Sequence, residues 1–324
     1  MVRSVTVRAP CSTANVGAGF DIFGLALDAF YDEVTVTKRP KEFGIKIVTD
    51  DKIPKKLKLN TAGIVAEQMM SIDQGSFCPA PNKKYGVEIK IKKDVPAGYG
   101  LGSSAASAAA CAIGINELFE MKFDKEKLTF FAGHGEEASA GVAHYDNVAA
   151  AVFGNFVVVF SNPSDEKIGQ VGCRRLTPPS DLRLIIAVPK MKTKNQKTKL
   201  SRKAIPKEVK FSDAHTNKLN IIAMLLGILD KNAMIFGRGA EDVIVEQARK
   251  KMIPGFDKIK NGARKAGANN VTISGAGPSV IAFTTSGESG RRKDIEEAMR
   301  DGFKSAKLDC EIIYCKVSSG PKII

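Results

Sequence analysis

Residues 96–119 constrain the fold of this chain more than any other stretch, because they read PAGYGLGSSAASAAACAIGINELF. Glycines alternate at positions 98, 100 and 102, and two serines then lead into an alanine-rich apolar run. Upstream, residues 87–91 alternate apolar and polar side chains as a strand does. We therefore predict a strand, a glycine loop and a buried helix that begins near Ser103 or Ser104. The unpaired N–H groups at such a helix start, together with its dipole, attract anions.

A plain turn with an N-cap is the alternative interpretation of a Gly-Ser sequence. Three alternating glycines before a helix with almost no charged residues favour anion binding instead. The chain lacks GxxxxGK[ST], which excludes the usual P-loop, and it lacks the H-R-D and D-F-G motifs of protein kinases. A nucleotide site built mainly from backbone amides remains, with Ser and Glu side chains available for Mg²⁺.

Two more glycine loops accompany the first. Residues 11–27 read CSTANVGAGFDIFGLAL, in which Asn15 and Asp21 are the polar members. Asp21 stands among apolar neighbours, and a carboxylate buried there needs a partner, so we interpret it as functional rather than as a turn residue. The third loop, SGAGPS at residues 274–279, lies between two apolar runs and adds a further set of backbone donors.

Composition narrows the class of protein. A chain of 324 residues with 44% hydrophobic and 26% charged residues is typical of a globular protein of two domains. Six scattered cysteines and three histidines argue against a Cys/His metal cage or a disulfide framework, and no apolar run is long enough to span a bilayer. We therefore expect a cytoplasmic location. The net charge of +14 favours anionic partners, either nucleotides or nucleic acid, unless it is only a solvated surface.

The hydrophobic pattern predicts an irregular alternation of strands and helices, which is typical of the α+β class. Strands are expected at residues 3–10, 33–37, 45–48, 149–160, 182–188 and 311–317, with 33–37 and 45–48 paired in a hairpin or meander. Helices are expected at residues 60–72, 125–140, 217–230, 241–252, 256–266 and 294–306, of which 217–230 reads as buried. The polar segment 161–180 marks the domain boundary, and the basic segment 190–203 predicts a mobile loop beside a site.

One more cluster is a candidate for chemistry. Residues 133–148 read GHGEEASAGVAHYDNV and bring Glu136, His144, Asp146 and Asn147 into one segment. A lone histidine is more often structural than catalytic, and paired glutamates are usually a solvated helix face. The four residues together, directly before an apolar run, favour a functional site.

These loops together carry a resemblance to a known family. STANVGAGFD, PAGYGLGSSAA and SGAGPS match, in order and spacing, the three motifs of the GHMP kinases, and the match spans essentially the whole chain. Within that superfamily the sequence looks most like the homoserine kinases, through NVGAGFDIFGLAL, AHYDNVAAAVFGNFVVV and the spacing Thr198-x-x-x-Arg202. The resemblance implies a ribosomal-protein-like N-terminal domain at residues 1–165 and a ferredoxin-like C-terminal domain at residues 166–324.

The resemblance also implies a role for individual residues at the nucleotide. ATP phosphates are expected on the glycine loop, and Mg²⁺ near Ser104 and Glu136, while Asn60 at the head of its helix matches the position that reads adenine. The cofactor-binding residues implied are Asn60, Pro96, Ala97, Gly98, Tyr99, Gly100, Leu101, Gly102, Ser103 and Ser104.

The implied substrate is L-homoserine, a small amino acid whose hydroxyl is phosphorylated on the route to threonine. Its matching positions are Asn15, Asp21, His144, Asn147, Thr198, Arg202, Arg249 and Gly275. An arginine suits its carboxylate, Asp21 its ammonium, and Asn147 or Asn15 its hydroxyl. The resemblance implies no clear side-chain base. His144 is the reserve candidate, as the only nearby group expected to titrate near neutrality.

Other functions stay open at this point. Another small-alcohol kinase on the same scaffold, acting on shikimate or mevalonate, is the nearest alternative, although mevalonate offers Asp21 no cation. A ligand sensor or a basic RNA-binding protein would fit the charge. Against nucleic acid, aromatic residues make up only 7% of the chain and no aromatic RNA motif is present. The sequence predicts no membrane partner and leaves a homodimer open.

Overall fold

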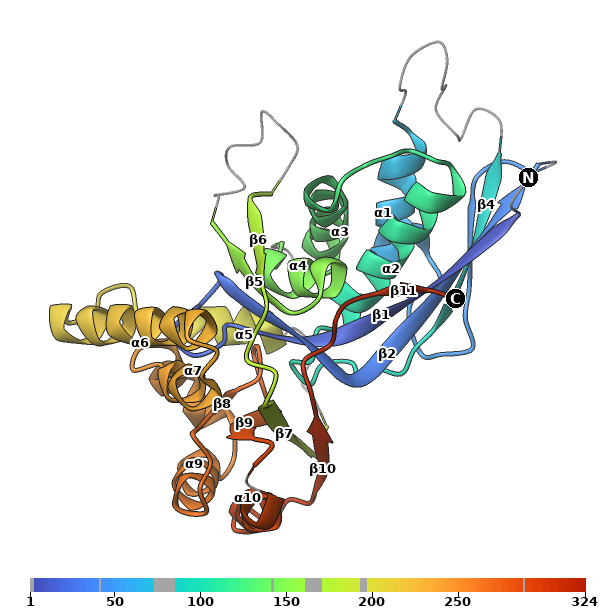
Figure 1. Ribbon diagram of the computed structural model, residues 1–324. Helices are drawn as coiled ribbons and strands as arrows, with labels where there is room; N and C mark the ends of the chain where they lie inside the picture. The colour runs from blue at the N-terminus through green and yellow to red at the C-terminus, as the bar shows by residue number, and fades with distance from the viewer. Residues whose placement is uncertain are drawn as a thin grey trace.

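The computed structural model describes residues 3–40, 42–72, 85–140, 143–160, 171–192, 197–287 and 289–324, without the side chains of 138–140, 197–198 and 289. Two sheets, each covered by helices, occupy different parts of the molecule (Figure 1). The α+β class expected from the sequence is confirmed. None of the helices in the described ranges combines the length and the apolarity that crossing a membrane requires.

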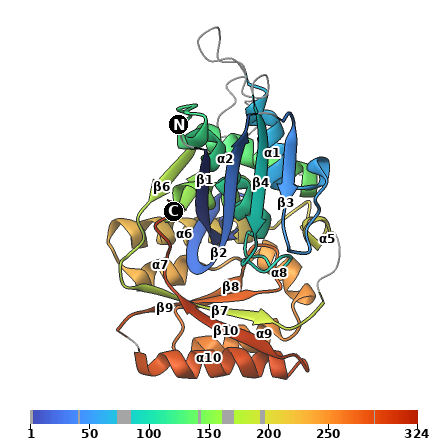
Figure 2. The same ribbon diagram turned by 90° about the vertical axis from the view of Figure 1, so that its right-hand side faces the viewer.

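The first sheet is built around two long antiparallel strands, β1 (Ser4–Ala14) and β2 (Phe23–Arg39). Its strands run in the order β11-β1-β2-β4-β3, of which Figure 2 shows β1, β2, β4 and β3 side by side. Strand β5 pairs with the start of β2 and with β6. The shorter strands are β3 (Ile45–Val48), β4 (Gly86–Lys92), β5 (Phe156–Val159), β6 (Cys173–Leu176) and β11 (Lys322–Ile323).

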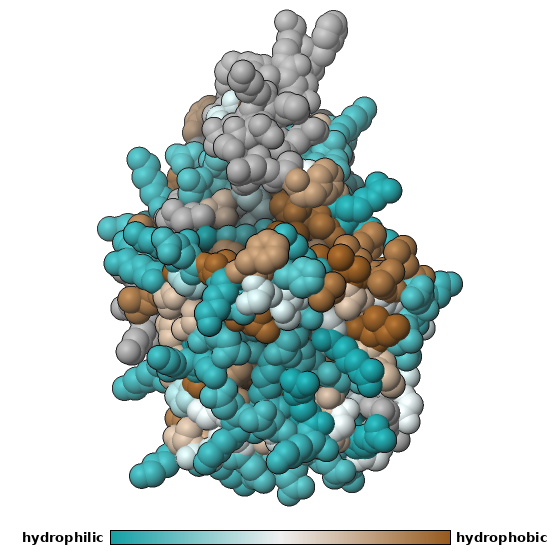
Figure 3. Space-filling model, turned by 90° about the vertical axis from the view of Figure 1, so that its left-hand side faces the viewer, coloured by the Kyte–Doolittle hydropathy of each residue, from teal (hydrophilic) through white to brown (hydrophobic). Residues whose placement is uncertain are grey.

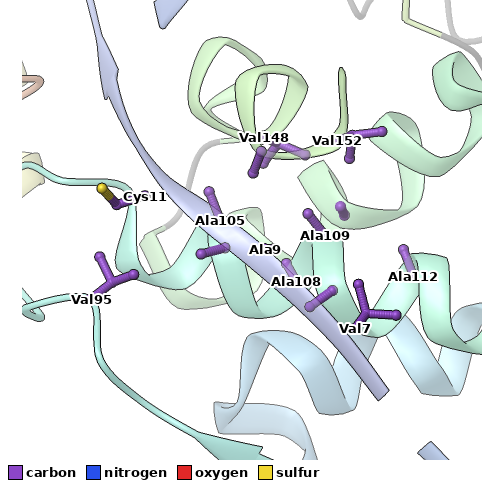
Figure 4. Packing of buried hydrophobic residues seen from close by; sticks show 14 of the residues in the cluster. Val7, Ala9, Cys11, Val95, Ala105, Ala108, Ala109, Ala112, Val148 and Val152 are labelled. Atoms are coloured by element: carbon purple, nitrogen blue, oxygen red, sulfur yellow. The ribbon is translucent and has the colours of Figure 1, made fainter. Parts of the chain in front are cut away.

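Four helices pack on one face of this sheet: α1 (Thr61–Met70), α2 (Ser103–Leu118), α3 (Lys125–Ala140) and α4 (Tyr145–Phe153). Helix α2 lies against β1, with small side chains from both elements in contact (Figure 4). A Cβ on Gly114 would stand 2.9 Å from Val36 Cγ2, so the backbones of α2 and β2 approach closely there. Because its alanine side chains are small, α2 packs deep in the core, and this packing fixes the position of the helix N-terminus.

The second sheet has the antiparallel order β10-β7-β9-β8. Its strands are β7 (Leu182–Pro189), β8 (Asn270–Ile273), β9 (Val280–Thr285) and β10 (Cys310–Cys315). Helices α9 (Phe256–Lys265) and α10 (Ser289–Lys304) cover the face farther from the first sheet, as Figure 2 shows. This order and these crossovers give the ferredoxin-like arrangement that the resemblance implied, and that prediction is confirmed.

Alternate residues of β7 join different cores. Ile185 and Ala187 pack with α9 and α10, whereas Leu184 and Ile186 belong to the large core that is shared with the first sheet. The remaining helices are α5 (Lys197–Lys203), α6 (Phe211–Leu229), α7 (Ala233–Gly239) and α8 (Val245–Arg249). Two 3-10 turns lie at Leu57–Leu59 and Lys250–Met252. The expected boundary at residue 165 lies outside the described residues and stays a prediction, while β6 and β11 both pair in the first sheet.

Several predictions of secondary structure are wrong in detail. Strand β3 pairs in parallel with β4, so it forms no hairpin with β2. The apolar run 149–160 is not one strand, because α4 continues to Phe153 and Gly154 (φ 72°) breaks the chain before β5.

The C-terminal half holds further corrections. The basic segment 190–203 contains helix α5 and is not simply a loop, although residues 193–196 lie outside the described ranges. The helix expected at 241–252 begins only at Val245, because the Asp242 carboxylate accepts hydrogen bonds from the first free amides, at Ile244, Val245 and Glu246. Helix α6 exists but is largely exposed rather than buried.

Candidate active site

A cavity of about 550 Å³ opens where the three glycine loops meet. Ser274 Oγ lies 2.8 Å from the Gly100 carbonyl oxygen and 3.0 Å from Thr13 Oγ1, and the Gly275 N–H donates to the Ala14 carbonyl at 3.2 Å. Most candidate residues line this cavity: Asn15, Asp21, Asn60, Ala97, Gly98, Gly100, Leu101, Gly102, Ser103, Ser104, Glu136, His144, Asn147, Arg202, Arg249 and Gly275. Motifs from both halves of the chain therefore converge on one space.

One end of the cavity is the N-terminus of α2. The three alternating glycines all have positive φ, at 83° for Gly98, 78° for Gly100 and 67° for Gly102. A Cβ on Gly100 would stand 2.1 Å from the Ser274 carbonyl oxygen, so only glycine fits between the loops. No side chain caps α2 and its first turn holds no acidic residue. The first amides of a 16-residue helix thus face the cavity, as an anion site requires.

A buried ion pair supports this loop. Lys93 Nζ donates to the Asp32 carboxylate, to the Ser103 carbonyl oxygen at 2.7 Å and to Ser107 Oγ at 2.9 Å. Asp32 is fully buried and also accepts from Ser107 Oγ at 2.7 Å and from the backbone amides of residues 94 and 95. The network joins β2, the segment after β4 and the first turn of α2, and it places an ammonium group beside the anion site.

Ser104 and Glu136 form the second polar feature of this end. The Ser104 hydroxyl donates to Glu136 Oε1, and Glu136 is only 4% exposed. Burial raises the pKa of the Glu136 carboxyl, against the opposing effects of the Ser104 hydrogen bond and the Lys93 charge. The side chain of the neighbouring Glu137 is instead 55% exposed, and it lies 3.4 Å from His134 Nδ1. Within the described part of the chain no cluster of three His, Cys, Asp or Glu side chains could hold a metal by itself.

Asn60 forms part of the cavity wall, but both polar atoms of its side chain are already hydrogen-bonded to the backbone. It caps α1, because its Oδ1 accepts from the Gly63 amide at 3.1 Å, and its Nδ2 donates to the Pro54 carbonyl oxygen at 2.8 Å. A direct role in reading adenine stays a prediction.

The opposite end of the cavity is a cluster of charges. Arg202 Nη2 donates to Asp21 Oδ1 at 2.7 Å, and the guanidinium groups of Arg202 and Arg249 lie 5.4 and 5.1 Å from the Phe20 ring centroid. Arg249 is 4% exposed, donates to the Gly275 carbonyl at 3.2 Å, and has its pKa lowered to about 10, mainly by burial. The expectation that Asp21 is buried is wrong, since its side chain is 40% exposed and Arg202 supplies its partner.

His144 lies beside the same arginine, with Nδ1 3.2 Å from Arg202 Nη2. A guanidinium only donates, so Nδ1 accepts and the ring proton of the neutral histidine sits on Nε2. That Nε2 is buried without a hydrogen-bond partner among the described residues. Burial, followed by the Arg202 charge, lowers the pKa of His144 to about 4. The expectation that it titrates near neutrality is therefore wrong.

Asn147 lines the cavity between the helix N-terminus and the charge cluster. Ser12 Oγ donates to Asn147 Oδ1 at 3.0 Å, which turns the amide group so that Nδ2 is left to face the cavity. Asn15 has φ 55° and holds the first glycine loop, because its Oδ1 accepts from the Asp21 amide at 3.0 Å. Asp146, next to Asn147, is 1% exposed, and burial followed by the Asp21 charge raises the pKa of its carboxyl to about 7.

Two candidate residues do not line the cavity, and the side chain of a third is not described. Pro96 and Tyr99 belong to the glycine loop but do not line the cavity, and the Tyr99 hydroxyl instead donates to the Met191 carbonyl oxygen at 2.7 Å. Thr198 lies in α5, and its side chain is outside the described part of the structure. The substrate role of Thr198 stays a prediction.

Sequence reasoning missed Lys93, Asp32 and Ser107. A signal for the ion pair existed, because Val87, Ile89 and Ile91 face the core with period two and Lys93 continues that face. Asp32 has the same phase as Val34 and Val36 on β2, and the β2–β4 register places Glu33 opposite Lys92. Two opposite charges at inward-facing positions of paired strands predict a buried ion pair.

Comparisons with known proteins agree with this geometry. The family model for the N-terminal domain of GHMP kinases matches residues 65–155, and the model for their C-terminal domain matches residues 224–305. A homoserine kinase of Methanococcus vannielii is 35% identical over 98% of this chain and 98% of its own length. This chain belongs to the GHMP kinase family. A second homoserine kinase, of Thermoplasma volcanium, is 36% identical to this GHMP kinase over 86% of the chain and 83% of the relative.

Solved structures extend the comparison. The crystal structure of a homoserine kinase from Cytophaga hutchinsonii has a TM-score of 0.86 and 34% identity to this GHMP kinase, and covers all of this chain and 98% of its own. A mevalonate kinase of L. major, at TM-score 0.66 and 14% identity, shares the fold alone. The resemblance to the family and to its homoserine kinase branch is confirmed.

Proposed function

We propose that this GHMP kinase transfers the γ-phosphoryl group of ATP to the side-chain hydroxyl of L-homoserine, giving O-phospho-L-homoserine for threonine biosynthesis. The observation that carries the proposal is a single cavity with an uncapped helix N-terminus at one end and an Asp21–Arg202–Arg249 cluster at the other. Relatives named homoserine kinase at 32–36% identity support it.

The charged end suits an amino acid. A zwitterion offers a carboxylate to Arg249 and Arg202 and an ammonium to the exposed oxygen of Asp21. The Nε2–H of His144, which has no partner among the described residues, is one more donor for the carboxylate. Mevalonate would leave Asp21 without a cation, which disfavours it as the substrate.

The phosphate end suits a nucleotide. The amides that start α2, the positive-φ glycines and the Lys93 ammonium give a cradle for a triphosphate. Ser104 and Glu136 provide one hydroxyl and one carboxylate, a donor set that fits Mg²⁺ when phosphate oxygens and water complete the coordination. Bound there, the ion would neutralise charge on the phosphates as it does in other phosphoryl transfers.

The residues around the acceptor hydroxyl position it rather than remove its proton. Asn147 presents its amide N–H₂ to the middle of the cavity, so it would donate to the hydroxyl oxygen and aim that oxygen at the phosphorus. His144 cannot accept the proton at Nε2, because Nε2 already carries one. Transfer through a loose transition state depends mainly on alignment and charge neutralisation, so no side-chain base is required.

The test is ADP release from MgATP with homoserine, shikimate, mevalonate and galactose as acceptors. Turnover with homoserine alone, abolished in Asn147→Ala, is the expected result. Equal turnover with a neutral alcohol would refute the amino-acid site, and no turnover with any acceptor would refute the kinase assignment. We also propose a cytoplasmic location, which the five free cysteines of the described chain support: Cys11, Cys111, Cys173, Cys310 and Cys315.

A further inference from the structure

A second cavity lies in the C-terminal half of the chain. It has a volume of about 510 Å³ and shares no lining residue with the cavity described above. Its walls come from α7, the end of α9 and the turn that follows, the start of β8 and the first turn of α10. Figure 1 shows α7 and α9 beside β8, which is an edge strand of the second sheet. This volume is within the range of small-molecule sites.

Arginines give the second cavity its charge. Each of the three helices contributes one, Arg238 from α7, Arg264 from α9 and Arg291 from α10, and we call the space the arginine cavity. None of the described Asp or Glu residues lines it. Arg238 has no hydrogen bond or ion pair with the described part of the chain. Like charges around one concave surface repel one another, and an anion between them offsets that repulsion.

The carboxylate of Glu241 compensates Arg264 only in part. Its Oε2 lies 3.6 Å from Arg264 Nη1 but also accepts from Asn270 Nδ2 at 2.8 Å, and its Oε1 accepts from Lys260 Nζ at 2.8 Å. The Arg264 side chain is 52% exposed, so its ion pair with Glu241 is a weak one. Because a guanidinium has five N–H donors, Arg264 keeps donors for a ligand.

Close packing holds the wall of the arginine cavity in place. Gly267 has φ 106°, and the Arg291 side chain lies against it, since a Cβ there would stand 2.7 Å from Arg291 Cδ. A Cβ on Gly237 would likewise stand 2.7 Å from the Cβ of Asn269. Asn269 Nδ2 is buried without a hydrogen-bond partner among the described residues. A buried donor without an acceptor is costly, and a ligand oxygen in this cavity would supply the acceptor.

We propose that the arginine cavity binds a small molecule that carries a phosphate group. Guanidinium groups present paired N–H donors that match the oxygens of a phosphate. The volume leaves room for an organic part beside the phosphate, and Met234, which is 41% exposed, adds apolar surface to the wall. The proposal uses none of the residues assigned to ATP or homoserine.

A nucleic-acid strand is the competing ligand, because the chain has a net charge of +14. Figure 3 views the side on which α7 and α9 lie in Figure 1, and it shows mostly hydrophilic side chains below a band of hydrophobic ones. Proteins that bind single strands stack the bases on aromatic side chains, and none of the described aromatic residues lines the arginine cavity. Three arginines around one concave surface therefore favour a small phosphorylated molecule.

The test follows the Met234 methyl group by NMR in the full-length protein with carbon-13-labelled methionine methyl groups. The variant Met234→Leu identifies its signal among those of the nine methionines. Inorganic phosphate and glycerol 3-phosphate are titrated against sodium chloride at matched ionic strength. We expect a saturable shift of the Met234 signal, with a Kd of roughly 1 mM or lower, for at least one of the two phosphates. No saturable shift with either, or the same shift with chloride, refutes the proposal.

The two phosphates also separate the sources of the ligand. A lower Kd for glycerol 3-phosphate would show that the cavity binds the organic part as well, and equal values would show that it recognises the phosphate group alone. Both results support the site. A single-stranded oligonucleotide that shifts the Met234 signal when neither phosphate does would overturn the proposal in favour of nucleic acid.

Matched variants locate the binding. Arg238→Gln and Arg291→Gln, at two exposed residues, should each raise the Kd at least about tenfold. The control is Arg292→Gln, because Arg292 does not line the cavity and instead lies 3.9 Å from the Tyr314 ring centroid and 2.6 Å from Glu296. Its Kd should equal that of the wild type. Equal losses in all three variants would show general attraction to a basic surface and refute the site. The NMR signal does not depend on turnover, so the outcome is independent of the proposed function.

Discussion

Lys93→Met should destabilise this kinase more than any exposed lysine substitution. The change removes the ammonium group that faces the Asp32 carboxylate, which has no exposed surface. The donors that remain on Asp32 are the Ser107 hydroxyl at 2.7 Å and the amides of Asp94 and Val95 at 3.1 Å. These are neutral, so the buried charge would lose its only opposite charge in the described structure. Breaking one side of a buried pair costs about 3–5 kcal/mol.

The assay is thermal and urea unfolding of matched variants. A loss of about 3 kcal/mol corresponds to a Tm decrease of about 4 °C for a chain of 324 residues, because the unfolding entropy is roughly 2.1 cal/mol/K per residue. Lys92→Met is the control, since the adjacent lysine is 75% exposed and meets Glu33 at 3.5 Å, and its effect should stay within about 0.5 kcal/mol.

A double variant separates the charge from the packing. Asp32→Asn keeps an acceptor for the two amides and removes the charge, so Lys93→Met/Asp32→Asn should recover a coupling energy of roughly 2 kcal/mol or more. If Lys93→Met and Lys92→Met unfold alike, or if the double variant is no better than the sum of the single ones, the pair does not hold the loop in the way described.

Three further outcomes are expected. Asp21→Asn should raise the KM for homoserine at least tenfold and leave the KM for ATP unchanged, because Asp21 faces only the amino-acid end; parallel increases in both values would contradict this separation. Glu136→Gln should shift the Mg²⁺ dependence of turnover to higher concentrations, while Glu137→Gln, on the exposed side of α3, should not. His144 has a pKa of about 4 in the folded protein against 6.5 unfolded, so the unfolded chain binds more protons between these values. Its contribution to stability is present above pH 6.5 and lost as the pH falls toward 4. Unfolding of His144→Gln measured across that window should show a shallower acid decline than wild type, by at most about 3 kcal/mol.

The anion site was predictable because local rules agree at that point. Each of Gly98, Gly100 and Gly102 takes the positive φ that glycine permits, and the alanine run that follows packs closely against β1 (Figure 4). The local backbone conformation and the tertiary packing both require small residues at these positions. For this reason the loop and the start of α2 at Ser103 follow from the sequence with little error.

The errors arise where burial depends on distant parts of the chain. Helix α6 has the apolar content of a core helix, but periodicity alone does not tell how much of that apolar surface the rest of the chain covers. Asp21 likewise looked buried from its apolar neighbours, and the partner that keeps it at the surface, Arg202, lies 181 residues away. The alternation of buried and exposed residues along β4 was a usable signal for Lys93. The Asp32 carboxylate that pairs with Lys93 lies on a different strand, β2.

The charge cluster also explains why a histidine beside the proposed substrate site need not act as a base. Arg202 and Arg249 both lower the pKa of His144, and Arg202 further occupies its Nδ1 lone pair. The same two arginines are proposed to bind the carboxylate of the substrate, so the cluster that suits an amino acid also keeps the His144 ring neutral with its proton on Nε2. Asp146 remains as the group with a pKa of about 7, but it does not line the cavity and accepts from the Asn147 amide. Its position suits it to hold Asn147 in place rather than to accept a proton from the acceptor hydroxyl.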